Sequence, residues 1–319
     1  MVQAGVKAVL QYRASAGFRA QLEAARPSWL SLAIVEETDR DGFAREMRDA
    51  EVLLHVLEPV TGTVMASAPR LRLIQKIGVG VNTIDVDTAK ARGIAVCNMP
   101  GSNSQAVAEA TLLLMLATLR RLTVLDAMTR AGAGWQLPMD SFDGMGEIGG
   151  RTVGLVGYGD VPRRLAPALR ALGADIVYTA RSEKPDAVGR WRSLDALLSM
   201  SDIVSLHVPL TPETAGLLSP ARLAAMKPGA VLVNTARGGL VDEPALVEAL
   251  RGGHLRGAGL DVFAAEPTGA GNPLFGMDNV VVAPHVAWLT PETLARSIHV
   301  AMDNCARLRS GEALVHRVA

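Results

Sequence analysis

Short apolar runs alternate with helical patterns along almost the whole chain, and this alternation constrains the fold more than any other feature. Such alternation indicates parallel strands joined by crossover helices. A first series predicts strands at Lys7–Leu10, Glu51–His55, Leu73–Ile77 and Ile94–Val96. A second series predicts strands at Thr152–Val156, Asp175–Thr179, Ile203–His207, Val231–Asn234, Ala258–Asp261 and Val280–Ala283. We therefore expect an α/β protein with two Rossmann-like, doubly wound parallel sheets.

The chain length and the position of a Pro-Gly step predict two domains. A chain of 319 residues is long for a single core. The Pro100-Gly101 step ends the first series, and a final helix starting near Pro291 is too short a tail to fold alone. We predict a flavodoxin-like substrate domain from residues 1–101 and 287–319, and a dinucleotide-binding Rossmann domain from residues 102–286. The two crossings place a cleft between them.

Composition excludes several classes of partner. The chain has 32 basic and 32 acidic residues, and a net charge of zero argues against nucleic-acid binding. The longest apolar run, near Leu112 to Leu119, is far too short for a membrane span, and the N-terminus lacks a secretory signal pattern. Cys97 and Cys305 are too few for a disulfide framework and lack metal-ligand spacing. We expect a cytoplasmic protein without a metal site.

A glycine-rich turn follows the first strand of the second series and opens a helix. Gly157 and Gly159 would let the backbone and the helix N-terminus approach a pyrophosphate. The third glycine of the usual fingerprint is replaced by Pro162, which the first helical turn tolerates because its missing N–H would have no intrahelical partner. The amides of Asp160 and Val161 remain available for the cofactor.

The end of the next strand bears on the choice between NAD and NADP. NAD-selective sites carry an acidic residue there, which binds the ribose hydroxyls. This chain has Ala180 at that position, followed by Arg181 and Ser182. A carboxylate would repel a 2′-phosphate by about 3 kcal/mol per charge pair at ~5 Å, whereas a guanidinium binds it through two donors. We expect NADP(H) to be preferred and NAD to be possible; the alternative is an ordinary exposed arginine.

Arg237, Glu266 and His285 each follow a predicted strand closely, at the end of the sheet where ligands of open α/β folds bind. An arginine there suits a carboxylate and a neighbouring keto oxygen, although alone it could equally be a structural ion-pair partner. Imidazole titrates near neutral pH, and a nearby carboxylate orients the ring and favours its protonated form. These groups are the ones needed to transfer a hydride to or from a carbon beside a carboxylate.

The ordered series of motifs resembles the D-isomer-specific 2-hydroxyacid dehydrogenases over nearly the whole chain. The stretches that carry the resemblance are Ile77–Asp85, Arg92–Ile94, Asn98–Gly101, Val107–Glu109, the glycine-rich turn, Asp202–Thr211 and Met226–Asp242. The resemblance implies reduction of a small 2-keto acid, glyoxylate or hydroxypyruvate, to a D-2-hydroxy acid. It also implies a homodimer, for which the apolar helix predicted from Ala106 to Leu122 is a candidate contact.

The resemblance also assigns roles to residues. Arg237 would bind substrate, Glu266 and His285 would form the acid–base pair, and the backbone of Val79 and Gly80 would hold the substrate carboxylate. Asp261 would hydrogen-bond the nicotinamide carboxamide, with helix capping as the alternative. The rest of the cofactor pocket would comprise Val208, Pro209, Thr235, Ala236 and His207. For His207 the alternatives are a structural role and a place near the cofactor ribose.

The sequence departs from the family pattern beside the histidine, and it leaves alternative functions open. The family usually reads His-x-Gly at the histidine, whereas this chain reads His285-Val286-Ala287-Trp288, so Trp288 either lines the substrate pocket or packs at the hinge. Corepressors that share this fold make a nucleotide-sensing protein the main alternative, and a dehydrogenase using NAD and another 2-hydroxy acid is a second one. Phosphite and formate oxidation are disfavoured, because such relatives are expected to carry Lys at Val79 and Gln at Glu266, respectively.

Overall fold

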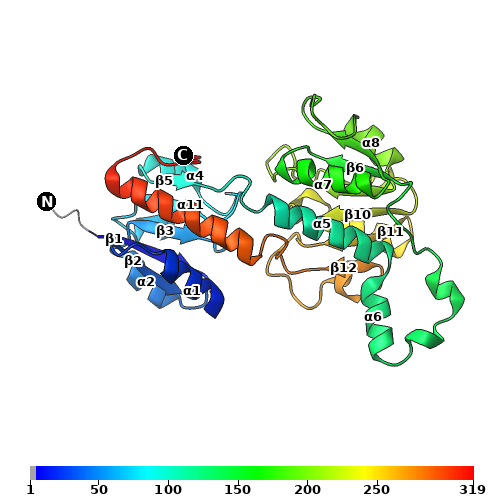
Figure 1. The fold of residues 1–319 in the computed structure, drawn as a ribbon, viewed down its shortest axis with the longest axis horizontal. Helices are drawn as coiled ribbons and strands as arrows, with labels where there is room; N and C mark the ends of the chain where they lie inside the picture. The colour runs from blue at the N-terminus through cyan, green and yellow to red at the C-terminus, as the bar shows by residue number, and fades with distance from the viewer. Residues whose placement is uncertain (1–4) are drawn as a thin grey trace. The chain divides into compact units, whose positions relative to one another are not determined.

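The computed structural model describes residues 5–319, which form two compact units (Figure 1). One unit comprises the described residues up to Asn103 together with Leu289–Ala319, and the other comprises Ser104–Trp288. Among the described residues, no helix is both long and apolar enough to cross a membrane.

The first unit is built on a five-stranded parallel sheet in the order β2-β1-β3-β4-β5, the flavodoxin-like order. Its strands are β1 (Val6–Gln11), β2 (Leu30–Val35), β3 (Val52–His55), β4 (Leu73–Lys76) and β5 (Ala95–Cys97). Its helices are α1 (Ala16–Ala25), α2 (Arg40–Met47), α3 (Gly62–Ala66), α4 (Val86–Ala91) and α11 (Pro291–Ser310). Helix α11, near the C-terminus, packs against α1 and β4 of this unit.

The second unit is built on a seven-stranded parallel sheet in the order β12-β11-β10-β9-β6-β7-β8. The strand order reverses direction between β6 and β9, which is the doubly wound arrangement that binds nucleotides at the reversal. The strands are β6 (Thr152–Val156), β7 (Asp175–Thr179), β8 (Arg190–Trp191), β9 (Ile203–Leu206), β10 (Ala230–Asn234), β11 (Leu255–Leu260) and β12 (Val280–Val282).

The helices of this unit cover the sheet and also extend beyond it (Figure 1). They are α5 (Ser104–Leu119), α6 (Leu122–Arg130), α7 (Asp160–Ala171), α8 (Leu194–Met200), α9 (Pro220–Ala224) and α10 (Glu243–Arg251). Short 3₁₀ helices are η1 (Gly134–Gln136), η2 (Met139–Phe142), η3 (Gly238–Leu240) and η4 (Pro273–Gly276). The helix predicted to reach Leu122 ends at Leu119, because Arg121 adopts a left-handed backbone (φ 50°) that separates α5 from α6.

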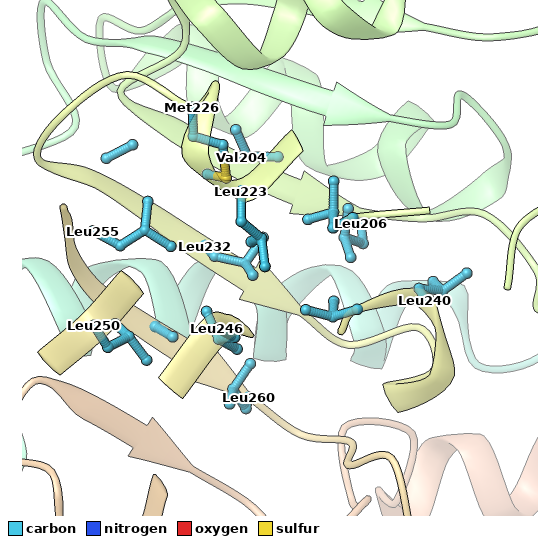
Figure 2. Close-up of a cluster of buried hydrophobic side chains, with 14 of the residues drawn as sticks. Val204, Leu206, Leu223, Met226, Leu232, Leu240, Leu246, Leu250, Leu255 and Leu260 are labelled. Atoms are coloured by element: carbon cyan, nitrogen blue, oxygen red, sulfur yellow. The ribbon is translucent and has the colours of Figure 1, made fainter. Parts of the chain in front are cut away.

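Two apolar clusters bury both faces of this sheet. Leu232 of β10 packs into one cluster, with Leu206 and Leu246 (Figure 2). Its neighbours Val231 and Val233 pack into the opposite cluster. Successive residues of a strand point to opposite faces, so both sides of β10 are covered by apolar side chains. The polar residue of this strand, Asn234, is its last. The chemistry is therefore carried by the segments that follow the strands.

Candidate active site

The glycine-rich turn connects β6 to α7, and its position 157 requires glycine. Gly157 has a left-handed backbone (φ 99°), and a Cβ atom there would lie 2.8 Å from the carbonyl oxygen of His207. Its N–H donates to the carbonyl of Thr179 at 2.9 Å, which ties the turn to the end of β7. No heavy atom of the described chain lies within 4 Å of a Cβ built on Gly159, the N-cap of α7, so a ligand group has room there.

The N-terminus of α7 accommodates the proline that breaks the fingerprint. The helix begins at Asp160, which puts Pro162 in its first turn, where an N–H has no intrahelical acceptor. No side chain of residues 5–319 forms a capping hydrogen bond at this helix end. The amides of Asp160 and Val161 are thus at the positive end of the helix dipole, an arrangement that fits a pyrophosphate.

Three residues predicted to contact the ribose end of the cofactor follow β7. The carbonyl of Ala180 accepts a hydrogen bond from the Trp191 indole at 3.1 Å, while Arg181 and Ser182 are exposed. Within the described chain, no carboxylate forms an ion pair with Arg181. A guanidinium presented in this way can bind a phosphate group.

The segment after β9 lies against the glycine turn. The His207 N–H donates to the Val156 carbonyl at 2.7 Å, and the Val208 side chain would lie 3.0 Å from a Cβ on Gly157. Burial lowers the pKa of His207 to about 3, so its imidazole is neutral. Its Nε2 atom is buried and has no hydrogen-bond partner among the described residues. An orphaned buried polar atom fits a site that is completed by a polar ligand. Pro209, two residues after His207, is exposed.

The segment after β10 is organised by Asn234. The Asn234 side chain accepts the Ala236 N–H at 3.0 Å and donates to the Arg237 carbonyl at 2.8 Å, which shapes the turn that carries the arginine. The Thr235 hydroxyl lies 2.8 Å from that of Thr111. Because the Thr111 hydroxyl donates to the Val107 carbonyl, Thr235 donates to Thr111 and keeps acceptor capacity.

Arg237 lies partly buried at the end of this turn. Burial lowers its pKa below the ordinary arginine value, and the charge of Glu266 acts in the opposite direction. An arginine remains protonated at all physiological pH values, so the site contains a fixed, partly desolvated positive charge. Gly238 comes next, and a Cβ on it would overlap the backbone of Phe263, three residues before Glu266.

Glu266 and His285 form a hydrogen-bonded pair. The Glu266 Oε2 atom lies 2.6 Å from His285 Nδ1, and Glu266 Oε1 accepts the Phe263 N–H at 2.8 Å. Burial acts to raise the pKa of Glu266, but the hydrogen bonds from His285 and Phe263 outweigh it and hold the pKa below the usual glutamate value. The carboxylate is therefore ionised at neutral pH. With Nδ1 bound to it, Nε2 is the ring nitrogen that can exchange a proton with a substrate.

Asp261 fixes the backbone around His285. Asp261 is buried, and its two carboxylate oxygens accept the N–H groups of Val286 at 2.8 Å and Ala287 at 3.0 Å. Burial raises its pKa despite these hydrogen bonds. His285 has a left-handed backbone (φ 57°), a conformation that is uncommon for residues other than glycine and needs support from its surroundings. The helix-capping alternative for Asp261 is thus wrong, because its acceptors serve the histidine loop; the nicotinamide contact stays a prediction.

Trp288 also contacts the histidine backbone. Its indole N–H donates to the His285 carbonyl at 3.1 Å, and the side chain is partly buried. The sequence contains no signal for this contact, since Trp288 and His285 belong to an irregular segment. This hydrogen bond indicates a third role besides lining the substrate pocket and packing at the hinge, namely support of the backbone at His285.

Val79 and Gly80 belong to the first unit, whereas the other predicted site residues belong to the second. They follow Gly78, whose φ of 138° is accessible mainly to glycine. Val79 is exposed, and its carbonyl accepts the Asn98 side-chain amide at 2.9 Å. The N–H groups of Val79 and Gly80 donate to no backbone group of the described residues. Two adjacent amides of this kind can bind a carboxylate.

Comparisons with known proteins give one consistent family. Residues 112–287 match the model of the NAD binding domain of the D-isomer specific 2-hydroxyacid dehydrogenases. The chain is 43% identical over 268 residues to D-3-phosphoglycerate dehydrogenase of Mycobacterium tuberculosis, covering 82% of this chain and 50% of that one. It thus spans about half the length of the mycobacterial relatives that it matches. Glyoxylate reductase of Aeropyrum pernix is 40% identical over 275 residues, covering 83% of this chain and 82% of that one.

Solved structures agree over nearly the full chain. The TT0316 protein of Thermus thermophilus superposes with a TM-score of 0.90 at 36% identity, covering 98% of this chain and all of that one. The NADPH-dependent glyoxylate/hydroxypyruvate reductase of Sinorhizobium meliloti, solved with NADP and malonate, superposes with a TM-score of 0.85 at 29% identity, covering 99% and 97% of the two chains.

Proposed function

Since this chain belongs to the D-isomer-specific 2-hydroxyacid dehydrogenases, we propose that it reduces a small 2-keto acid to the D-2-hydroxy acid. The 2.6 Å contact between Glu266 and His285 is the observation that carries this proposal. An ionised carboxylate hydrogen-bonded to an imidazole, together with a partly buried arginine, favours catalysis over nucleotide sensing, although corepressors of this fold can keep the same residues. Glyoxylate and hydroxypyruvate are the proposed substrates, in keeping with the names of the Aeropyrum and Sinorhizobium relatives.

The residues of the second unit divide the chemistry among them. Arg237 binds the substrate carboxylate and the neighbouring keto oxygen, and it stabilises the negative charge that develops on the keto oxygen as hydride reaches the keto carbon. His285 donates a proton from Nε2 to the keto oxygen, and Glu266 holds the ring in position through Nδ1. The nicotinamide, when bound, supplies the hydride. In the first unit, the amides of Val79 and Gly80 hold the substrate carboxylate.

The cofactor is proposed to be NADP(H). Gly157, Gly159 and the first amides of α7 would hold the pyrophosphate, and the neutral imidazole of His207 supplies a polar atom beside it. Ala180 removes the acid that selects NAD, and the exposed Arg181 supplies a guanidinium for the 2′-phosphate. Asp261 retains acceptor capacity for the nicotinamide amide, since each carboxylate oxygen can accept a second hydrogen bond.

A substrate panel tests this function. Catalytic efficiency should be measured with NADPH and with NADH for glyoxylate, hydroxypyruvate and 3-phosphohydroxypyruvate, the last because the mycobacterial relatives are D-3-phosphoglycerate dehydrogenases. We expect turnover of at least one of the first two acids and higher efficiency with NADPH. Tight NADPH binding without turnover of any keto acid would instead favour the nucleotide-sensing alternative.

We also propose that the chain is a homodimer and that it acts in the cytoplasm. Large apolar side chains are exposed in α5, α6 and the two 3₁₀ helices that follow: Leu113, Leu116, Leu122, Trp135 and Met139. A second copy of the chain would remove this surface from water. Light scattering after gel filtration should give the mass of a dimer, and Leu113→Lys should shift the mass towards that of the monomer.

The two cysteines support the proposed cytoplasmic location. Cys97 and Cys305 are buried free thiols, which are stable in a reducing compartment.

A further inference from the structure

We propose that Tyr158 and Tyr178 are positioning residues for cofactor choice, because they hold the segment that presents Arg181 to a 2′-phosphate. This inference rests on the NADP preference proposed above. The segment runs from Ala180 to Gly189 and connects β7 to β8. It has no helix or strand of its own, so its conformation depends on bonds to neighbouring elements.

The two tyrosine hydroxyls provide such bonds. Tyr178 of β7 accepts the N–H of Lys184 at 2.8 Å, three residues after Arg181. Tyr158 accepts the N–H of Val188 at 2.6 Å, near the end of the segment. Both residues are buried, and their ring centroids are 4.5 Å apart. A buried aromatic pair has little freedom to move, so the two loop amides are held in fixed positions.

The tyrosines also connect this segment to the pyrophosphate turn. Tyr158 lies between Gly157 and Gly159, and Gly157 is itself hydrogen-bonded to Thr179 at the end of β7. The Arg163 guanidinium of α7 lies over the Tyr158 ring, 5.7 Å from its centroid, and forms an ion pair with Asp186 of the segment. The two parts of the dinucleotide site are therefore one bonded assembly.

The Arg181 guanidinium takes no part in these bonds that fix the segment. The tethers act on the backbone of Ala180, Lys184 and Val188 and on the side chain of Asp186. A backbone that is already ordered loses less entropy when a ligand binds. This smaller entropy loss should increase the affinity for NADP, whose 2′-phosphate Arg181 would contact. It should have almost no effect on the affinity for NAD, which lacks that group.

Calorimetric titration of the full-length protein with NADP⁺ and NAD⁺ tests this inference without relying on turnover. Tyr178→Phe removes the hydroxyl that accepts the Lys184 N–H. We expect the Kd for NADP⁺ to rise about three- to tenfold and that for NAD⁺ to change less than about twofold. Amide hydrogen exchange at Lys184 should become faster without cofactor. Tyr12→Phe in the first unit is the matched control and should change neither Kd.

A double-mutant cycle with Arg181→Gln separates positioning from a general structural effect. If Tyr178 acts through Arg181, Tyr178→Phe should have no further effect on NADP⁺ binding in the Arg181→Gln background. A persisting effect there, or equal weakening for both cofactors, would overturn the inference. The inference would also be overturned if Arg181→Gln lost NADP⁺ affinity and Tyr178→Phe did not. That result would leave the proposed NADP preference intact. An unchanged NADP⁺ affinity in Arg181→Gln would overturn both.

Discussion

Gly238 lies so close to Phe263 that a Cβ on it would overlap the Phe263 carbonyl group. This approach joins two segments that are distant in the sequence, since Arg237 immediately precedes Gly238 and Phe263 donates its N–H to Glu266. The glycine thereby brings the arginine turn after β10 against the glutamate loop after β11. The segments that carry Arg237 and Glu266 can pack together because Gly238 has no side chain.

Gly238→Ala should therefore destabilise the second unit and lower turnover. Overpacking of this kind typically costs about 1–3 kcal/mol of unfolding free energy, because a backbone segment must move. Urea unfolding and steady-state kinetics would measure both effects. Gly269→Ala is the matched control, because no atom lies within 4 Å of a Cβ built there. If the two variants were equally stable and active, the close approach would have no functional meaning.

His285→Ala should lower turnover by about two to four orders of magnitude, the usual contribution of a positioned acid or base. The Kd for NADPH should not change, since the imidazole is proposed to act on the substrate oxygen. Fluorescence titration and steady-state rates measure the two quantities. His299→Ala alters an exposed histidine of α11 and should leave turnover unchanged. Full activity in His285→Ala would remove this residue from the mechanism.

Glu266→Gln should change the pH dependence of keto-acid reduction. The pKa of Glu266 lies below the usual glutamate value, so in the unaltered protein the carboxylate stays charged until the pH falls below that range. Its charge orients the His285 ring through the hydrogen bond to Nδ1. In the unaltered protein the reductive rate should therefore fall at acid pH, as Glu266 becomes protonated below the usual glutamate range. Glu266→Gln has no carboxylate to protonate, so its rate should be lower at neutral pH and should lack this acid limb. An acid limb at the same pH in both proteins would contradict this coupling.

Trp288→Phe tests support of the histidine loop. The variant keeps an aromatic ring and removes the N–H that donates to the His285 carbonyl. Loss of one such hydrogen bond, about 0.5–1.5 kcal/mol, should lower turnover about two- to tenfold without changing NADPH affinity. Trp29→Phe, whose ring lies under Arg309 in the first unit, serves as control. An unchanged rate in Trp288→Phe would reduce its role to packing.

The sequence predicted the parts of the fold that repeat. Short apolar runs located the strands of the second sheet except β8, because most of these strands are buried on both faces. Strand β8 was missed because it has only two residues, Arg190 and Trp191, both exposed. Strand β2 was missed because it lies at a sheet edge, where Leu30–Val35 is only partly buried and follows no regular alternation.

The candidate site was predictable to a different degree. Polar residues after buried strands predicted Arg237, Glu266 and His285, because strand ends of a parallel sheet meet at one edge. The supporting contacts were not predictable. Asp261 reaches across 25 residues to Val286, and Tyr158 reaches across 30 to Val188, through irregular segments without periodicity. Only Asn234 carried a usable signal, since an asparagine two residues before a turn amide often forms such a bond.

Transfer of deuterium from the nicotinamide tests the central claim most directly. The protein should be incubated with hydroxypyruvate and NADPH that carries deuterium at the transferred position of C4, and the product analysed by NMR and chiral chromatography. We predict D-glycerate with deuterium at C2, formed by the unaltered protein and nearly absent with His285→Ala. Glycerate of the L configuration, product without deuterium, or an equal yield from the His285 variant would contradict reduction by Arg237, Glu266 and His285.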